Sequence, residues 1–294
     1  MRNKSNVTVI IPCYNDGEFI MNAINSILQQ TLNADRIIVI DDGSEIATTD
    51  ILKDISLLGV EVFFQENMGV CKTRNRAIEM SNTEYILSLD ADDYFEPTFI
   101  EKAVEILNES SHIGVVGCFY KRIEGNMVQE SIIKPQGGKV ENFLIKNNGL
   151  GCSMFRRKCW EEVSGYDELM VRGYEDWDFW ISILKNKWEM YIIDEPLFNY
   201  RIKLKSRDQT AFESYDFDLK NYILNKHKLL YLDNFDLYVQ YLISENEKLF
   251  VKNKNLKNTT IKLKKSIDFK IGYFLLKPFR FLKSKMGCIF NFSK

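Results

Sequence analysis

Three carboxylates follow an apolar run in residues 85–94, which read Tyr-Ile-Leu-Ser-Leu-Asp-Ala-Asp-Asp-Tyr. The apolar part is typical of a buried strand, and Asp90, Asp92 and Asp93 stand at its carboxyl end, where open α/β sheets bind ligands. Carboxylates this close repel one another unless water or a divalent cation offsets their charge. Their hard oxygen atoms suit Mg²⁺ or Mn²⁺, so the run predicts a metal-bridged phosphate site. The simpler alternative is an acidic turn before a helix that begins near Pro97.

The elements that must position these acids alternate between strand and helix. Strands are predicted at 7–11, 36–40, 60–64 and 85–89, with helices between them that end near 29 or span 49–58 and 69–80. This alternation favours right-handed β-α-β units and a parallel sheet. Asp41 and Asp42 end the second strand, so we expect them at the same sheet edge as the first cluster. Arg74 comes from the third helix and would offer positive charge to a diphosphate.

The glycine-rich phosphate loops of two common nucleotide-binding classes are missing from the sequence. No Gly-x-Gly-x-x-Gly follows the first strand, and no Walker-type lysine loop occurs. This separates the chain from dinucleotide-binding dehydrogenases and P-loop enzymes. Neutralisation of a phosphate would therefore depend mainly on a metal ion.

The pattern changes after Pro97. A helix to about 108, an antiparallel hairpin over 113–133, a short helix over 139–147 and a strand at 153–155 are predicted. The fold class is therefore α/β with a mixed, mainly parallel central sheet. The expected catalytic domain covers 1–210, with a nucleotide-binding half at 1–95 and an acceptor-side half at 96–210. A helical, basic extension over 211–294 completes the chain.

A second acidic run begins another predicted helix. Trp177, Trp180 and Ile181 have the spacing of a buried helical stripe, which makes the tryptophans core residues before anything else. Asp176 precedes that stripe by one residue and lies in the first turn, at the edge of the apolar face. Partial desolvation there can raise a carboxyl pKa, which suits a general base. The neighbouring acids, Glu175 and Asp178, are explained well enough as helix caps.

Composition limits the remaining classes. The chain has 294 residues, 45% of them apolar, which is enough to bury a substantial core. Its six cysteines form no Cys-x-x-Cys pair, and with two histidines they offer no zinc site, so reduced thiols in a cytoplasmic protein are expected. We expect no signal peptide and no membrane-spanning helix.

The C-terminal part differs in charge from the rest. Residues 248–294 hold 13 Lys or Arg and one acid, against 26 basic and 40 acidic residues before them. Helices are predicted over 215–250, and Pro278 should interrupt any helix in the basic part. This basic amphipathic part would either contact an anionic membrane from the cytoplasmic side, as a peripheral protein does, or pack on the body or on another subunit. Homo-oligomerisation stays open, and nucleic acid is disfavoured as a partner.

Seven short blocks occur in order along residues 5–207. They read Val9-Ile10-Ile11-Pro12-Cys13-Tyr14-Asn15, Val39-Ile40-Asp41-Asp42-Gly43-Ser44, Asn67 with Gly69 and Arg74-Asn75, Leu89-Asp90-Ala91-Asp92-Asp93, Gly165-Tyr166-Asp167-Glu168, Glu175-Asp176-Trp177-Asp178 and Tyr200-Arg201. Together they resemble the glycosyltransferase family 2 enzymes. The resemblance implies a GT-A fold, a Rossmann-like sheet that binds a nucleotide-diphospho-sugar. It also implies an inverting transfer of a hexosyl or N-acetylhexosaminyl group, usually from a UDP-sugar.

The same resemblance implies roles for individual residues. Asp176 matches the catalytic base, and Asp90 and Asp92 match the Asp-x-Asp motif that binds Mn²⁺ or Mg²⁺, with Asp92 as the usual direct ligand. Many relatives have a His shortly after the Tyr-Arg pair, where this chain has Lys203 and Lys205, either of which would pair with phosphate. The resemblance further implies that the nucleoside is bound by Pro12, Tyr14, Asp16 and Asp42. It implies that Arg74 and Arg201 contact the diphosphate, and it places Asp90 among the nucleotide-binding residues too.

These features predict an inverting glycosyltransferase that uses a metal ion and a single displacement. Its acceptor would be a glycan or a lipid-linked sugar in cell-surface polysaccharide biosynthesis. The alternatives are a sugar-phosphate nucleotidyltransferase, which would release pyrophosphate, and a non-catalytic sugar-nucleotide-binding subunit.

Overall fold

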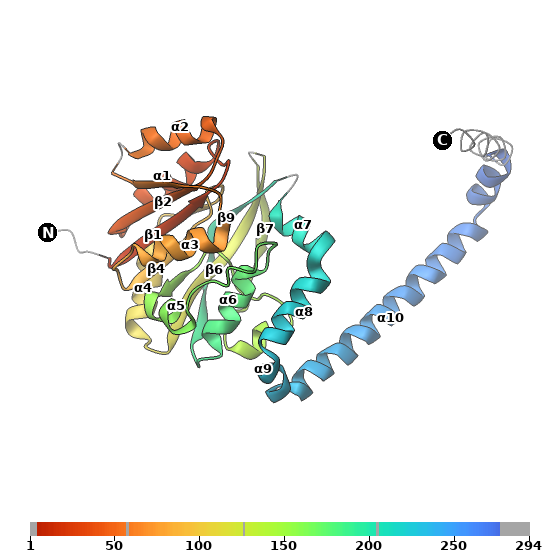
Figure 1. Ribbon diagram of the computed structural model, residues 1–294. Coiled ribbons are helices and arrows are strands. Elements are labelled where there is room, and N and C mark those ends of the chain that lie inside the picture. Colours follow the sequence, from red (N-terminus) through yellow and green to blue (C-terminus); the bar gives the residue numbers. More distant parts are fainter. Residues whose placement is uncertain (1–4, 57–58, 126, 204–205, 277–294) are drawn as a thin grey trace, which may run out of the picture. The chain divides into compact units, whose positions relative to one another are not determined.

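The computed structural model describes residues 5–56, 59–125, 127–203 and 206–276 (Figure 1). Contacts divide the chain into two compact units, one that ends at Asn234 and one that begins at Phe235. The first unit includes part of the predicted 211–294 extension. Lys205, Pro278 and Cys288, which the sequence analysis singles out, lie outside the described residues.

The N-terminal half of the sheet is parallel, as predicted. β1 (Val7–Cys13) pairs in parallel with β2 (Arg36–Asp42) and β4 (Tyr85–Ser88), and β2 pairs in parallel with β3 (Glu61–Gln65). The side chains of Val9, Ile10, Ile11, Ile38 and Val39 are fully buried, which explains the uninterrupted β-branched runs. The connecting helices are α1 (Ile20–Leu28), α2 (Ile46–Ile55) and α3 (Val70–Glu79).

The second half makes the sheet mixed. The strand order is β3-β2-β1-β4-β8-β6-β9-β5, with β7 paired to β6, and β8 lies antiparallel between β4 and β6. The predicted hairpin is present as β6 and β7. The bounds are β5 (Tyr94–Phe95), α4 (Phe99–Glu109), β6 (Ile113–Glu124), β7 (Met127–Ile133), β8 (Met154–Arg156), α5 (Arg157–Val163), α6 (Glu175–Leu184) and β9 (Glu189–Ile202).

Two helix predictions need correction. The helix expected over 139–147 is only a 3₁₀ turn, Val140–Phe143. The helical stretch expected over 215–250 is divided into shorter pieces, because the turns at His227 and Asn234 end two helices. The pieces are α7 (Arg207–Thr210), a π-helical turn (Ala211–Tyr215), α8 (Asp216–Lys226), α9 (Lys228–Asp233) and α10 (Phe235–Lys265).

One sheet edge collects the chemistry. Cys13 and Asp41 are register partners at the carboxyl ends of β1 and β2, and β4 ends two residues before Asp90. β9 reaches the same region because Asn199 pairs with Tyr94 in β5. The loops after β1, β2, β4 and β9 therefore meet at this edge.

Among the described residues, five cysteines are buried and free, as expected for reduced thiols: Cys13, Cys71, Cys118, Cys152 and Cys159. No described helix combines the length and the apolar character needed to cross a membrane.

Candidate active site

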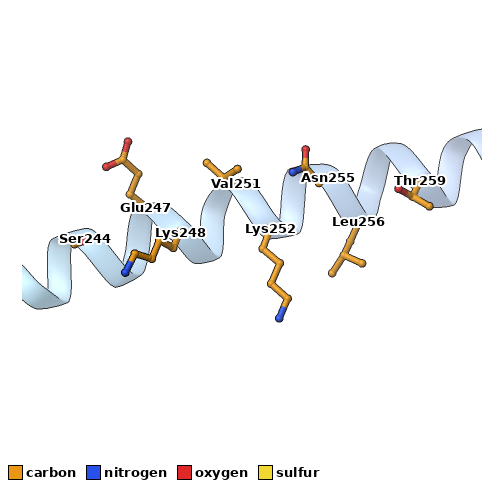
Figure 2. A pocket seen from close by; sticks show the side chains of 8 residues that line it. All are labelled: Ser244, Glu247, Lys248, Val251, Lys252, Asn255, Leu256 and Thr259. Atoms are coloured by element: carbon orange, nitrogen blue, oxygen red, sulfur yellow. The ribbon is translucent and has the colours of Figure 1, made fainter. Parts of the chain in front are cut away.

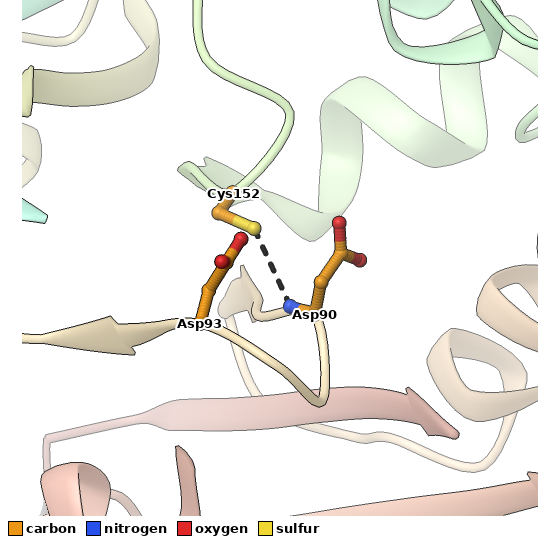
Figure 3. A group of neighbouring side chains, drawn as sticks. All are labelled: Asp90, Asp93 and Cys152. Carbon is orange, nitrogen blue, oxygen red and sulfur yellow. Dashed lines mark hydrogen bonds between the residues drawn. The ribbon is translucent and has the colours of Figure 1, made fainter. Parts of the chain in front are cut away.

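The loop after β4 holds the acidic cluster. Ligand atoms of Asp90, Asp93 and Cys152 all lie within 4.8 Å of one another, and the Asp90 N–H donates to Cys152 Sγ at 3.3 Å (Figure 3). Burial raises the pKa of Asp92, and the Asp90 carboxylate raises it further. Burial and both neighbouring acids also raise the pKa of Asp93 well above its ordinary value. Burial and mutual repulsion therefore disfavour the charged forms of Asp92 and Asp93 in this loop.

This donor set fits a hard divalent cation through its carboxylates. Burial raises the pKa of Cys152 well above that of a free thiol, so its sulfur is protonated and a poor ligand for Mg²⁺ or Mn²⁺. The carboxylates of Asp90 and Asp93 are the chemically suitable ligands of this group, which does not include Asp92, the residue that the family resemblance makes the direct ligand. A cation there would offset the repulsion between these carboxylates.

Lys203 contributes a positive charge to this cluster. Its ammonium pairs with Asp92 at 2.8 Å and also with Asp16 in the loop after β1. Burial opposes the charge on Lys203, but Asp92 and Asp16 hold its pKa above the ordinary lysine value. The end of β9 is thereby joined to the loops after β1 and β4.

The Arg201 side chain is held by backbone carbonyls and by an aromatic ring. Its side chain donates to the carbonyls of Asp92 (2.9 Å) and Gly125 (3.0 Å), and its guanidinium lies 4.4 Å from the centre of the Phe19 ring. Its backbone N–H donates to Asp93 at 2.7 Å. Arg201 therefore fixes the acidic loop against β9.

Arg74 connects the acidic loop to the start of α6. This guanidinium, 3% exposed, contacts Asp90 at 2.6 Å and Glu175 at 2.9 Å. Glu175 also pairs with Arg207, at the start of α7. Burial alone would raise the pKa of Glu175, but Arg207 and Arg74 hold it below its ordinary value. Glu175 is thus a buried, ionised residue that holds three elements together.

Asp176 follows Glu175 directly and is half-buried. Its Oδ2 accepts a hydrogen bond from the Asn147 side chain at 2.7 Å, and its Oδ1 accepts one from the Trp177 N–H at 2.8 Å. A Cβ at Gly151 would lie 3.2 Å from Oδ2, so the chain passes close to this carboxylate. Trp177 and Trp180 are buried, which confirms their core role.

Asp42 supports the loop after β2 and the start of α3. Its carboxylate accepts hydrogen bonds from the backbone N–H groups of Met68 (2.8 Å) and Gly69 (2.9 Å) and from Gln65 (2.7 Å). Gly43 has φ +76°, and a Cβ there would lie 2.7 Å from the Asn67 nitrogen. The close approach of the two loops therefore requires glycine.

The first loop presents the remaining predicted residues. Tyr14 is 52% exposed, and Pro12 is half-buried at the end of β1. The Asn15 N–H donates to Ser44 Oγ at 2.9 Å, which ties this loop to the one after β2. Tyr14 thus has a surface available for stacking.

Contacts link five of the predicted residues, Asp16, Arg74, Asp90, Asp92 and Arg201, directly or through Lys203. Asp16 connects to Asp92 through Lys203, and Asp90 connects to Glu175, next to Asp176, through Arg74. The sequence did not indicate Arg207 as a partner, and it explained Glu175 only as a cap. The presence of several acids at one helix start was the available signal, because buried acids need cations.

Comparisons with known proteins identify the family of this chain. The family model for glycosyl transferase family 2 matches residues 8–163. A putative teichuronic acid biosynthesis glycosyltransferase, TuaG of Bacillus subtilis (strain 168), is 29% identical over 202 residues, covering 67% of this chain and 79% of TuaG. Chondroitin synthase of Escherichia coli is 26% identical over 183 residues, covering 60% of this chain and 26% of the synthase.

Solved structures show the same fold. TarS of S. aureus, residues 1–349 in complex with UDP-GlcNAc, superposes with a TM-score of 0.58 at 20% identity, covering 70% of this chain and 61% of the TarS chain. The same TarS fragment in complex with UDP gives a TM-score of 0.54 at 21% identity, covering 67% of this chain and 60% of that chain. Sequence motifs, sheet topology and the family match agree, so the chain belongs to glycosyl transferase family 2 and is a glycosyltransferase with a GT-A fold.

Proposed function

We propose that this glycosyltransferase moves a sugar from a UDP-sugar to a glycan or lipid-linked acceptor of a cell-surface polysaccharide, with inversion at the anomeric carbon. Asp176 is the general base, and Asp90 and Asp92 hold Mn²⁺ or Mg²⁺. Pro12, Tyr14, Asp16 and Asp42 form the nucleoside side, and Lys203 faces the diphosphate with Arg74 and Arg201 behind it.

The observation that carries the proposal is the bridge made by Arg74. One buried guanidinium contacts Asp90 in the acidic loop and Glu175, the residue before Asp176. A base and a metal-binding acid must lie on opposite sides of one sugar for a single displacement, so their supports have to be connected rigidly. The bridge supplies that rigid connection.

The residues divide the chemistry between them. Asp176, oriented by Asn147 and the Trp177 N–H, takes the proton of the acceptor hydroxyl as that oxygen attacks the anomeric carbon. When bound, the metal ion neutralises charge on the leaving diphosphate. Lys203 is close enough to Asp92 to add a second positive charge on the same side.

The names of the relatives support the substrate classes. TarS is described in complex with UDP and with UDP-GlcNAc, and TuaG is named for teichuronic acid biosynthesis. A UDP-sugar and a polysaccharide acceptor are the donor and acceptor most consistent with these names. The proposal includes a cytoplasmic location, with contact between residues 248–294 and an anionic membrane as a separate, testable part.

The test is Asp176→Asn. The substitution keeps the size of the side chain and removes its basicity, so kcat for UDP release should fall by about 10²-fold or more while UDP binding is unchanged. Turnover is measured as UDP released by hydrolysis of a panel of UDP-sugars with Mn²⁺ or Mg²⁺, in which water takes the place of the acceptor hydroxyl, and binding is measured by calorimetry.

Asp194→Asn is the matched control, because Asp194 is exposed in β9. Full turnover in Asp176→Asn would remove this residue from the mechanism. Release of pyrophosphate from UTP and a sugar 1-phosphate, with no UDP released from any UDP-sugar, would overturn the proposed reaction.

A further inference from the structure

The helix α10 leaves its apolar side chains in solvent. It spans 31 residues, and none of them is buried. Leu242, Leu249, Leu256 and Leu263 are 48%, 56%, 55% and 60% exposed. A helix that stays fully solvated does not need large apolar side chains at regular intervals. The helix face that carries these leucines is therefore expected to bind a partner.

A shallow hollow along α10 does not explain the exposed leucines. Figure 2 shows that its lining side chains all project from this one helix. The hollow is therefore part of a helix surface and not an enclosed binding site. The lining residues are Ser244, Glu247, Lys248, Val251, Lys252, Asn255, Leu256 and Thr259.

The four leucines recur every seven residues, and Phe235 continues the series toward the N-terminus. Three residues before each leucine, the second position of the repeat holds Val239, Asn246, Asn253 and Thr260. A seven-residue repeat sustained over about four turns of the pattern predicts a left-handed coiled coil, with leucine at d and the second set at a.

We propose that α10 forms a parallel, in-register, two-stranded coiled coil with α10 of a second copy of this chain. Leucine at d with β-branched residues or asparagine at a is the combination that favours two parallel strands. The partner helix belongs to a second copy of this chain, because asparagine at a positions favours pairing with an identical helix in the same register. In a parallel pair each a residue faces its own counterpart, so Asn246 meets Asn246 and Asn253 meets Asn253, and each amide finds a hydrogen-bonding partner.

An antiparallel pair would place those amides opposite leucine and leave them without partners. The flanking charges add a recognisable property to the parallel pair. Lys252 at g faces Lys257 at e of the other helix, so the two ammonium groups repel. Added salt should therefore tighten the dimer, because it screens this repulsion and leaves the apolar seam intact.

The first experiment measures the mass of the full chain by light scattering during gel filtration at about 10–50 µM. We expect about 69 kDa, twice the 34.5 kDa of one chain. The seam variant Leu249→Asp/Leu256→Asp should return to the mass of one chain. The matched control Val251→Asp/Ile261→Asp should stay dimeric, because these side chains are similarly exposed, at 49% and 50%, but occupy the outer positions f and b.

The second experiment tests orientation. Asn246→Cys in a Cys288→Ser background should form a disulfide between copies under mild oxidation, because a parallel pair brings the two a positions within disulfide reach. Val251→Cys in the same background, on the outer face, should not.

Several results would overturn the proposal. A wild-type chain that is monomeric and pellets with phosphatidylglycerol vesicles would assign the exposed leucines to a membrane surface. Dissociation of the seam and control variants to the same extent, or a mass of three chains, would reject the paired seam. Failure of Asn246→Cys to cross-link in a dimer would reject the parallel register.

Discussion

At the scale of single residues, Lys203 decides how the acidic loop behaves without a metal ion. Its ammonium forms an ion pair with the Asp92 carboxylate at 2.8 Å and another with Asp16. A cation on Asp92 must displace this contact. In Lys203→Met, affinity for Mn²⁺ or Mg²⁺ without nucleotide should rise about five- to tenfold, the equivalent of about 1 kcal/mol for a partly exposed charged contact.

The same substitution should act oppositely on the nucleotide. With metal present, Lys203 is free to face the diphosphate, so Lys203→Met should weaken UDP binding by a similar factor, and Lys203→Arg should restore it. Calorimetry measures both affinities. Lys53→Met serves as the control, because Lys53 pairs with Asp50 on the exposed surface of α2. Unchanged affinity for both the metal ion and UDP in Lys203→Met would show that the ion pair between Lys203 and Asp92 does not affect the binding of either ligand.

Residue types were easier to predict than their partners. The sequence indicated Asp90 and Asp92 as site residues because acids at strand ends are visible in the local pattern, and the family resemblance added Asp16. The partner of Asp16 lies 187 residues away, and the partner of Glu175 lies 101 residues away on α3. Local periodicity holds no information on contacts at such separations. The structure was therefore needed to show that Arg74 bridges two acids.

At the scale of elements, α8 is attached to the catalytic body partly through Asp167. This carboxylate accepts hydrogen bonds from Tyr222 at 2.9 Å and from Lys226 at 2.6 Å. Burial alone would raise the pKa of Asp167, but Lys226, the Leu169 N–H and Tyr222 hold it below the ordinary value. The charged form is thus stabilised by folding, and it contributes to stability only while the residue is ionised.

Asp167→Asn should therefore destabilise the protein in a pH-dependent way. A lowered folded-state pKa gives stability that is present above the unfolded-state pKa of about 4 and is lost as pH falls through the folded-state value. We expect a loss of about 1–2 kcal/mol at pH 7 that shrinks below about pH 4. Urea unfolding between pH 3 and 7 measures it, with Asp194→Asn as the exposed control. A difference independent of pH would mean that packing, not charge, attaches α8.

Strong periodicity decided which elements could be predicted. The β-branched runs of β1 and β2 and the amphipathic helices α1 and α4 were visible in the sequence. β9 was not visible in the sequence, because Pro196 interrupts the alternation of its buried and exposed residues. Near Pro196 the pairing of β9 with β6 shifts register, between Cys118 and Phe119 of β6. Only its neighbours in the sheet make this stretch a single strand. The short β5 was missed because it has two residues.

At the scale of the whole molecule, charge and contacts divide the chain in similar places. The acidic part carries the sheet and the site, and residues 248–294 hold 13 basic residues against one acid. The sequence showed this asymmetry but not the boundary, because helices continue on both sides of Asn234. The contact boundary depends on burial, which stops with Tyr231 among the described residues.

A chain that ends at Asn234 should therefore keep the transferase site and lose both association between copies and the proposed membrane contact of residues 248–294. The residues removed include all of α10, none of which is buried, so the loss of apolar burial within one chain is small. The truncated chain should melt cooperatively within a few degrees of the full chain and bind UDP with the same affinity, but run at the mass of one copy. Calorimetric melting, UDP titration and light scattering measure these properties separately. If the truncated chain binds UDP but stays dimeric, the coiled coil is rejected and the proposed transferase site stands. If it is monomeric and folded but binds no nucleotide, the nucleotide site is rejected and the coiled coil stands.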